Sequence, residues 1–182
     1  MRDILVKKVM IPIADYVTVK KENNLAEVLH AFETKRKAEG GHAHRDAIVV
    51  DEGGRFVGKV TIIDIFRSLE PNYRKVRREQ KGYTLTDAFV REAVKEFKLW
   101  MEPTEDICQR GSKITVAEAM HVPDKTEYIK EDDNLEKAMN YYVMGVHQPL
   151  IVKKGDAVTG VLRFGDIFEI VRERLLSCYP VK

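Results

Sequence analysis

Cysteine is scarce in this 182-residue sequence, which has only Cys108 and Cys178. They stand far apart and form no Cys-x-x-Cys pair, so a disulfide framework or a zinc knuckle is not expected. No apolar run reaches the length of a membrane span, and residues 1–5 have too few apolar side chains for a signal peptide. The net charge of +2 gives no general attraction to nucleic acids or membranes. We therefore expect a reduced, cytoplasmic protein without membrane or nucleic-acid partners.

Catalytic signatures are also missing. The sequence has no nucleophile–base arrangement, no Walker loop and no dinucleotide-binding GxGxxG. Scattered carboxylates such as Asp15 and Glu22 show no paired placement that would serve acid–base chemistry. His42 and His44 form a His-x-His pair that could bind zinc or nickel with a third ligand, but the sequence fixes none. We expect no enzyme activity, no catalytic cofactor and no metal site.

The sequence does contain an internal repeat. Residues 4–34 align with 114–144, and residues 46–69 align with 148–171, each at a constant offset. The first copy is eight residues longer in the stretch between the two aligned blocks. Because so many positions match in phase on both sides of a single gap, the pattern indicates a duplication.

Both copies predict the order β-α-β-β-α. A short β-like stretch precedes a helix that begins after Asn24 in one copy and after Asn134 in the other. Two strands joined by a glycine turn follow, and a closing helix begins near Asp64 or Asp166. The predicted strand pairs are 47–50 with 55–61, and 150–152 with 157–162. Because one unit of about 60 residues buries little surface alone, we expect an α/β (α+β) fold with two units packed sheet to sheet.

Residues 71–111 lie outside the repeat, so we divide the chain into 1–70, 71–111 and 112–182. The middle segment begins with basic residues, for which a solvated helix face is the favoured interpretation and an anionic partner the alternative. These are Arg74, Lys75, Arg77, Arg78 and Lys81. A helix over 85–101 is apolar around more than half its circumference, which is wider than one docking face needs. It should therefore be covered by its own module or by another chain.

The repeated motifs resemble the CBS domain, and the pair resembles a Bateman module. The resemblance is carried by the strand 47–51, the turn at Gly53 and the run 56–65 in the first copy. The second copy matches through 148–152 and 158–167. The resemblance implies tandem CBS repeats packed as a pseudo-two-fold pair, with an inserted helical segment between them. It also implies clefts between the repeats that hold adenosine derivatives.

The Gly-x-apolar-Ser/Thr-x-x-Asp motif of this family implies roles for two residues of the first repeat. Asp64 would accept hydrogen bonds from both ribose hydroxyls, and Thr61 would lie beside the ribose or phosphate. In the second repeat Asp166 matches, but Arg163 replaces the hydroxyl residue and could either reach a phosphate or fill the cleft. A purely structural alternative is that both aspartates belong to first helical turns.

The remaining site residues are also implied by the resemblance. Arg45 and His147 precede the second strand of their repeats, where relatives place phosphate-binding residues. Apolar residues at matching positions would contact the adenine: Ile11, Pro12, Ile13, Ala47 and Ile48 in one set, and Val122, Pro123, Pro149 and Leu150 in the other.

The functional expectation is a ligand-sensing regulatory module that binds AMP, ADP, ATP or S-adenosylmethionine without catalysis. The alternative is a structural CBS pair with an empty cleft that serves protein interaction. A homodimer is expected because related modules often pair, and a protein effector is compatible with either hypothesis. Because it keeps both Thr61 and Asp64, the first cleft should bind ribose better.

Overall fold

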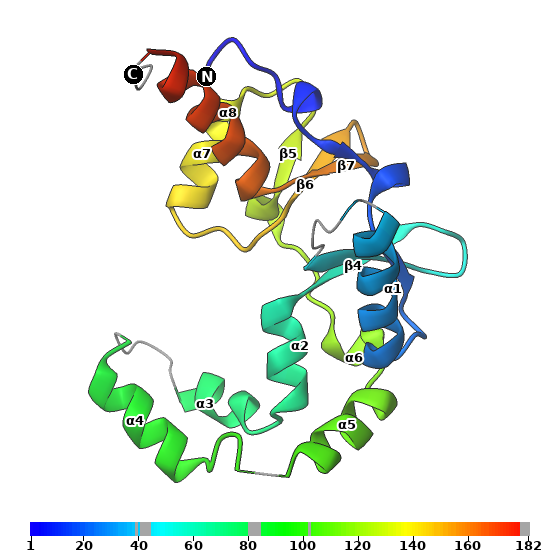
Figure 1. Ribbon diagram of the computed structural model, residues 1–182, viewed down its shortest axis with the longest axis vertical. Helices are drawn as coiled ribbons and strands as arrows, with labels where there is room; N and C mark the ends of the chain where they lie inside the picture. The colour runs from blue at the N-terminus through cyan, green and yellow to red at the C-terminus, as the bar shows by residue number, and fades with distance from the viewer. Residues whose placement is uncertain (39, 41–44, 80–84, 102, 179–182) are drawn as a thin grey trace. The chain divides into compact units, whose positions relative to one another are not determined.

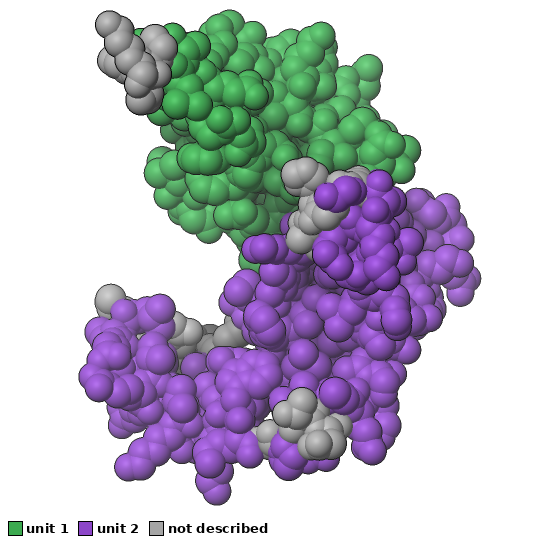
Figure 2. Space-filling view, in the orientation of Figure 1, with its two compact units in different colours: residues 1–17, 122–182 green, residues 18–121 purple. Residues whose placement is uncertain are grey.

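The computed structural model describes residues 1–38, 40, 45–79, 85–101 and 103–178 (Figure 1). Within these ranges the chain forms eight α-helices and two mixed sheets, which confirms the predicted α/β class. The chain divides into two compact units (Figure 2). Unit 1 combines residues 1–17 with 122–182, and unit 2 comprises residues 18–121. His42, His44 and Lys81 lie outside the described residues, so the expectation that the His-x-His pair binds no metal is not tested.

Unit 2 contains a three-stranded sheet in the order β2-β3-β4. The strands are β2 (Thr18–Lys20), β3 (Asp46–Val50) and β4 (Phe56–Thr61), with β2 parallel to β3 and β3 antiparallel to β4. The helices α1 (Leu25–Ala38) and α2 (Ile62–Leu69) belong to the same unit. Val19 pairs with Val49, and both are buried with Val28 of α1 in the core.

Unit 1 contains a four-stranded sheet in the order β1-β7-β6-β5. The strands are β1 (Ile11–Pro12), β5 (Tyr128–Lys130), β6 (Leu150–Lys154) and β7 (Ala157–Leu162), and the helices are α7 (Leu135–Val143) and α8 (Phe164–Cys178). Leu135, Leu150 and Ile167 are buried in one apolar cluster. The Tyr142 hydroxyl accepts a hydrogen bond from the Leu150 N–H (2.9 Å) and donates one to the Leu162 carbonyl, so it joins β6 to β7.

The predicted hairpins are confirmed in both units. Their turns contain Gly54 and Gly155 with φ of 74° and 59°, a left-handed conformation that glycine adopts without steric cost. The remaining repeat elements also follow the expected order β-α-β-β-α.

The segment that leads into each repeat pairs with the sheet of the other repeat. Ile11 of β1 pairs with Val161 of β7, and His121 forms the equivalent antiparallel bridge with Lys59 of β4. The 3₁₀ helix Val6–Lys8 therefore joins the core of unit 1, whereas α6 (Val116–Ala119) joins unit 2. The compact units are thus a different division of the chain from the sequence repeats.

Where the insertion is described, it forms three helices in unit 2, which are α3 (Tyr73–Glu79), α4 (Asp87–Glu96) and α5 (Thr104–Lys113). Thr86 caps α4 by accepting a hydrogen bond from the Phe89 N–H. The predicted extension of this helix to residue 101 is wrong. The helix ends at Glu96, and Lys98 and Trp100 then adopt positive φ values of 52° and 60°.

Candidate functional site

The junction between β4 and α2 places a hydroxyl and a carboxylate at the start of a helix. Thr61 is the N-cap of α2 and Asp64 stands three residues further on, which is the spacing of a capping box. The Asp64 Oδ2 atom accepts hydrogen bonds from the Thr61 N–H (2.9 Å) and the Thr61 hydroxyl (2.7 Å). The Asp64 N–H points back to the Thr61 hydroxyl oxygen at 3.4 Å. The structural interpretation of Asp64 as a helix cap is therefore confirmed.

The capping box is compatible with a second role as a polar binding site. Thr61 and Asp64 are 8% and 6% exposed, so both side chains are held in fixed positions at the edge of the sheet. A carboxylate at a helix N-terminus is stabilised by the free backbone N–H groups and by the helix dipole. An anionic acceptor beside a hydroxyl suits the recognition of neutral hydroxyl groups such as those of a sugar.

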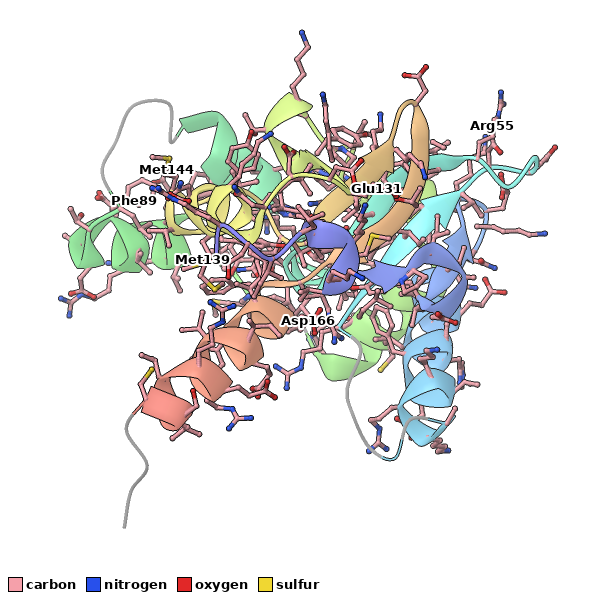
Figure 3. All side chains as sticks on the ribbon, turned by 90° about the horizontal axis from the view of Figure 1, so that it is seen from above. Arg55, Phe89, Glu131, Met139, Met144 and Asp166 are labelled. Carbon is pink, nitrogen blue, oxygen red and sulfur yellow. The ribbon has the colours of Figure 1, made fainter. Side chains whose placement is uncertain are left out.

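The equivalent junction between β7 and α8 is built differently. Asp166 lies in the first turn of α8 (Figure 3). Arg163 donates from Nε to Asp166 Oδ2 (2.9 Å) and from Nη2 to Asp166 Oδ1 (2.7 Å), which is a bidentate ion pair. Both carboxylate oxygens of Asp166 thus have a guanidinium partner, and the pair is partly buried. The Arg163 guanidinium therefore lies against the start of α8, where it neutralises the Asp166 carboxylate.

The glycine that opens each motif lies against the segment that leads into the other repeat. A β-carbon at Gly58 would stand 3.0 Å from both the His121 carbonyl oxygen and the Met120 sulfur. Such contacts are tighter than nine in ten real β-carbon contacts, so a side chain at Gly58 would require the segment 120–121 to shift by a few tenths of an ångström. The glycine therefore tells us about chain packing and does not by itself indicate a ligand.

The predicted adenine-contacting residues fall into different units. Ala47 and Ile48 are fully buried on β3 of unit 2, together with the Thr61–Asp64 junction. Ile11 to Ile13 belong to unit 1, so the first predicted set is divided between the units. The second set lies entirely in unit 1, where Pro123 and Leu150 are buried, Val122 is exposed and Pro149 follows a cis peptide bond. The grouping around an adenine ring stays a prediction.

The two predicted phosphate-contacting residues have different surroundings. Arg45 is exposed immediately before β3. His147 is half-buried before β6, with Nδ1 3.8 Å from Oε2 of Glu127. The sequence analysis missed Glu127, although its Asp124-x-x-Glu127 spacing is that of a capping box and its Oε1 accepts from the Asp124 N–H at 3.1 Å. Burial and then the negative charge of Glu127 raise the pKa of the neighbouring Tyr128 hydroxyl above its ordinary value.

Comparison with protein families identifies the first repeat. Residues 6–71 match the CBS domain family, a range that includes the whole Gly58–Asp64 motif. The sequence matches none of the curated proteins with which it was compared.

Comparison with solved structures extends the similarity to almost the whole chain. A crystal structure of CBSX2, a CBS-pair protein of Arabidopsis thaliana, in complex with AMP has a TM-score of 0.60 at 17% identity and covers 93% of this chain and 97% of that one. A CBS domain-containing protein of Bacillus anthracis has a TM-score of 0.61 at 14% identity, with coverage of 94% and 95%. This chain has the fold of a CBS-domain pair.

A third CBS structure is also similar over most of its length. It is the CBS domain of a bacterial CNNM/CorC family Mg²⁺ transporter in complex with ATP, with a TM-score of 0.56 at 15% identity and coverage of 94% and 89%. At these identities the similarity concerns the fold alone. No helix within the described parts of the chain combines the length and apolarity needed to cross a bilayer.

Proposed function

We propose that this CBS pair is a regulatory module that senses an adenine nucleotide through Thr61 and Asp64. The observation that carries the proposal is the β4–α2 junction, where a hydroxyl and an anionic carboxylate are held together within 2.7 Å at a helix N-terminus. Two structures with this fold contain AMP or ATP, which supports the ligand class. The ribose hydroxyls would donate to Asp64, because an ionised carboxylate only accepts hydrogen bonds.

The second junction should contribute less to ribose binding. The bidentate ion pair with Arg163 occupies both oxygens of Asp166. A ribose would have to displace a charge-assisted, two-point interaction before it could bind this carboxylate. We therefore propose one strong site for each chain, formed around Asp64, and a weak or vacant one around Asp166.

The proposed module binds its ligand without changing it. The sequence offers no nucleophile–base arrangement, and the residues at the β4–α2 junction form a helix cap instead of a paired acid and base. The ligand is an adenosine compound such as AMP, ADP, ATP or S-adenosylmethionine, and its binding would control a protein effector in the cytoplasm.

Isothermal titration calorimetry with these four compounds tests the proposal. We expect micromolar affinity for at least one of them, and mass spectrometry should recover the ligand unchanged after incubation. Asp64→Ala removes two charge-assisted hydrogen bonds to the ribose and should weaken binding by about 1.5–3 kcal/mol, or roughly tenfold to a hundredfold. The matched control is Asp166→Ala, which should have a smaller effect. Absence of heat with all four compounds would reject nucleotide sensing.

One observation favours a second function, in which the CBS pair acts only in protein association. Asp64 and Asp166 both have intramolecular partners, so each carboxylate also has a purely structural role. Under this hypothesis a nucleotide would change neither thermal stability nor oligomeric state, and Asp64→Ala would reduce only the stability of the protein.

Association into a homodimer is compatible with either function. Several large apolar side chains on helices are about half exposed, including Ile63 and Phe66 on α2 and Val90 and Val94 on α4. Where exposed apolar side chains gather into a patch, they are typical of protein contacts. We therefore propose a homodimer that is assembled through helical faces.

A further inference from the structure

The helix α2 connects the proposed nucleotide site to the insertion, and all of the contacts involved lie within unit 2. At its first turn the Asp64 carboxylate forms the capping box with Thr61. The Asp64 carbonyl accepts a hydrogen bond from the Ser68 hydroxyl at 2.8 Å, one turn further along the helix. With only eight residues, α2 is about 12 Å long and should respond to a change at its first turn as a single body.

The last turn of α2 holds both ends of the insertion. Glu70 is 3% exposed, and its Oε1 accepts from the Asn72 N–H at 3.0 Å, just before α3. Its Oε2 accepts from the Trp100 N–H at 2.7 Å, just after α4. On the return path, Nη1 of Arg110 in α5 donates to the Leu69 carbonyl at 2.5 Å. The position of the insertion is therefore set by the C-terminal end of α2.

Trp100 is the residue of the insertion most tightly connected to α2. Its ring packs edge-on against Phe66, with centroids 6.2 Å apart, and its Nε1 donates to the Tyr73 hydroxyl at 3.0 Å. Lys98 and Trp100 both adopt left-handed backbone conformations, which are costly for residues with a β-carbon. Such conformations persist only where surrounding contacts hold them, and Glu70 supplies one of those contacts through the Trp100 N–H.

We propose that α2 transmits occupancy of the Asp64 site to the insertion through Glu70 and Trp100. This inference rests on the proposed function, because it requires a ribose at Asp64. A ribose donates to the same carboxylate whose Oδ2 already accepts two hydrogen bonds from Thr61. Ligand binding therefore weakens the capping box and changes the N-terminal turn of α2. The helix carries this change to Phe66 and Glu70, and the left-handed backbone conformation of Trp100, which Glu70 stabilises, changes in turn.

A ligand shifts such an equilibrium only if it interacts differently with the two states. The two states here differ in the partners of Asp64, which are Thr61 alone in one state and Thr61 together with the ribose in the other. By linkage, contacts of the insertion with Glu70 also influence the affinity of the Asp64 site. The insertion is thus the part of unit 2 whose conformation changes on nucleotide binding and which an effector would recognise.

Trp100 is the only tryptophan of the chain, so its fluorescence reports on this region alone. AMP, ADP, ATP and S-adenosylmethionine should each be titrated in parallel by calorimetry and by Trp100 emission. We expect an emission change whose midpoint agrees with the calorimetric Kd. Calorimetric binding without an emission change would overturn this inference and leave the proposed function intact. The absence of calorimetric binding would reject both.

Glu70→Ala is the decisive variant, with Glu92→Ala on the exposed surface of α4 as its matched control. We expect Glu70→Ala to keep the nucleotide Kd within about tenfold while the emission change falls to less than half. Glu92→Ala should retain both properties. If Glu70→Ala does not fold, Glu70→Gln has the same shape but only one acceptor oxygen for the two N–H groups, and it should also reduce the emission change. A full emission change in the folded Glu70 variant would overturn the proposed route.

Discussion

Gly160 lies so close to Ile11 that a β-carbon added at Gly160 would stand 2.6 Å from the Ile11 carbonyl oxygen. This contact holds β1 against β7 in unit 1. Gly160→Ala should therefore destabilise the protein by about 1–3 kcal/mol, because backbone atoms must move to make room. Gly58→Ala should cost less, since its nearest contacts are at 3.0 Å and one of them is the flexible side chain of Met120. Urea unfolding of both variants measures the difference.

Gly165 provides the control for this pair of variants. It lies in the first turn of α8, and an added β-carbon would have no atom within 4 Å. Gly165→Ala should therefore be neutral or stabilise the helix by up to about 1 kcal/mol. Equal unfolding free energies for Gly160→Ala and Gly165→Ala would contradict the close approach of β1 to β7.

The ion pair between Arg163 and Asp166 predicts that the second junction can be converted into a site of the first kind. Arg163→Thr would release Asp166 and place a hydroxyl at the position that Thr61 occupies in the first repeat. We expect the AMP stoichiometry to rise from one toward two per chain by calorimetry. Stability should change by less than about 1 kcal/mol, because a part-exposed ion pair is exchanged for a helix cap.

Adding Asp166→Ala to Arg163→Thr should abolish the second binding event. If Arg163→Thr leaves the stoichiometry unchanged, the guanidinium is not what prevents ligand binding at the second junction. If it reduces binding, Arg163 contacts the ligand directly, as the alternative based on phosphate recognition holds.

The Tyr142 hydroxyl joins two strands in the core of unit 1, so its removal should be costly. Tyr142→Phe would take the side-chain partner from the Leu150 N–H and the Leu162 carbonyl, both in buried residues. We expect a loss of about 1–3 kcal/mol in unfolding free energy, measured by chemical denaturation. The adjacent Tyr141→Phe is the control, and similar losses for both variants would contradict a specific role of the Tyr142 hydroxyl.

Acid should weaken the attachment of the N-terminal segment to unit 1. A hydrogen bond from Lys7, with its positive charge, lowers the pKa of Asp132, and Arg2 lowers the pKa of Glu136 in the same way. Because these pKa values are lower in the folded state, their contribution is present above the unfolded pKa values and is lost as pH falls through the folded ones. The melting temperature should therefore fall as the pH is lowered below about 4.

Asp132→Asn should reduce this pH dependence, and added salt should reduce it further, since both ion pairs are exposed. A pH profile identical to that of the parent protein would show that the Lys7–Asp132 pair contributes nothing to stability in solution.

The exposed surface of α4 provides the test of the homodimer. Phe89 and Phe97 pack against Val76, Ala93 and Leu99 in the same chain, so replacing them would disturb the insertion itself. Val90 and Val94 are 42% and 44% exposed. Val90→Glu combined with Val94→Glu should therefore release monomers without loss of thermal stability, as measured by light scattering. An unchanged dimer would place the contact on another helical face.

The repeat made most of the secondary structure predictable. Strand positions followed from apolar runs and glycine turns, and helix starts followed from Asn24, Asn134 and the two motif aspartates. The end of α4 was not predictable in this way, because Lys98 and Trp100 adopt positive φ without being glycine. Their conformation depends on contacts such as that of Trp100 with Glu70, which is 30 positions away in the sequence.

The candidate site was predictable only in part. The capping role of Asp64 followed from its position at a strand–helix junction, and the structure confirms it. The pairing of Arg163 with Asp166 could have been found from their spacing of three residues, which brings oppositely charged side chains together in a first helical turn. The sequence could not show that the segment leading into each repeat pairs with the sheet of the other repeat. An alignment of two repeats shows which positions are equivalent, and it does not show which strands pair.

The segments that lead into the repeats also determine when each unit can be completed during protein synthesis. Unit 2 is one continuous stretch, from residue 18 to residue 121, so it can close while the rest of the chain is still being translated. Unit 1 cannot close at that stage, because Ile11 leaves the ribosome early whereas Val161, with which Ile11 pairs, lies near the other end of the chain. At ordinary translation rates the first strand waits on the order of ten seconds for β7. During that interval its backbone groups are exposed to any other strand edge that has already formed.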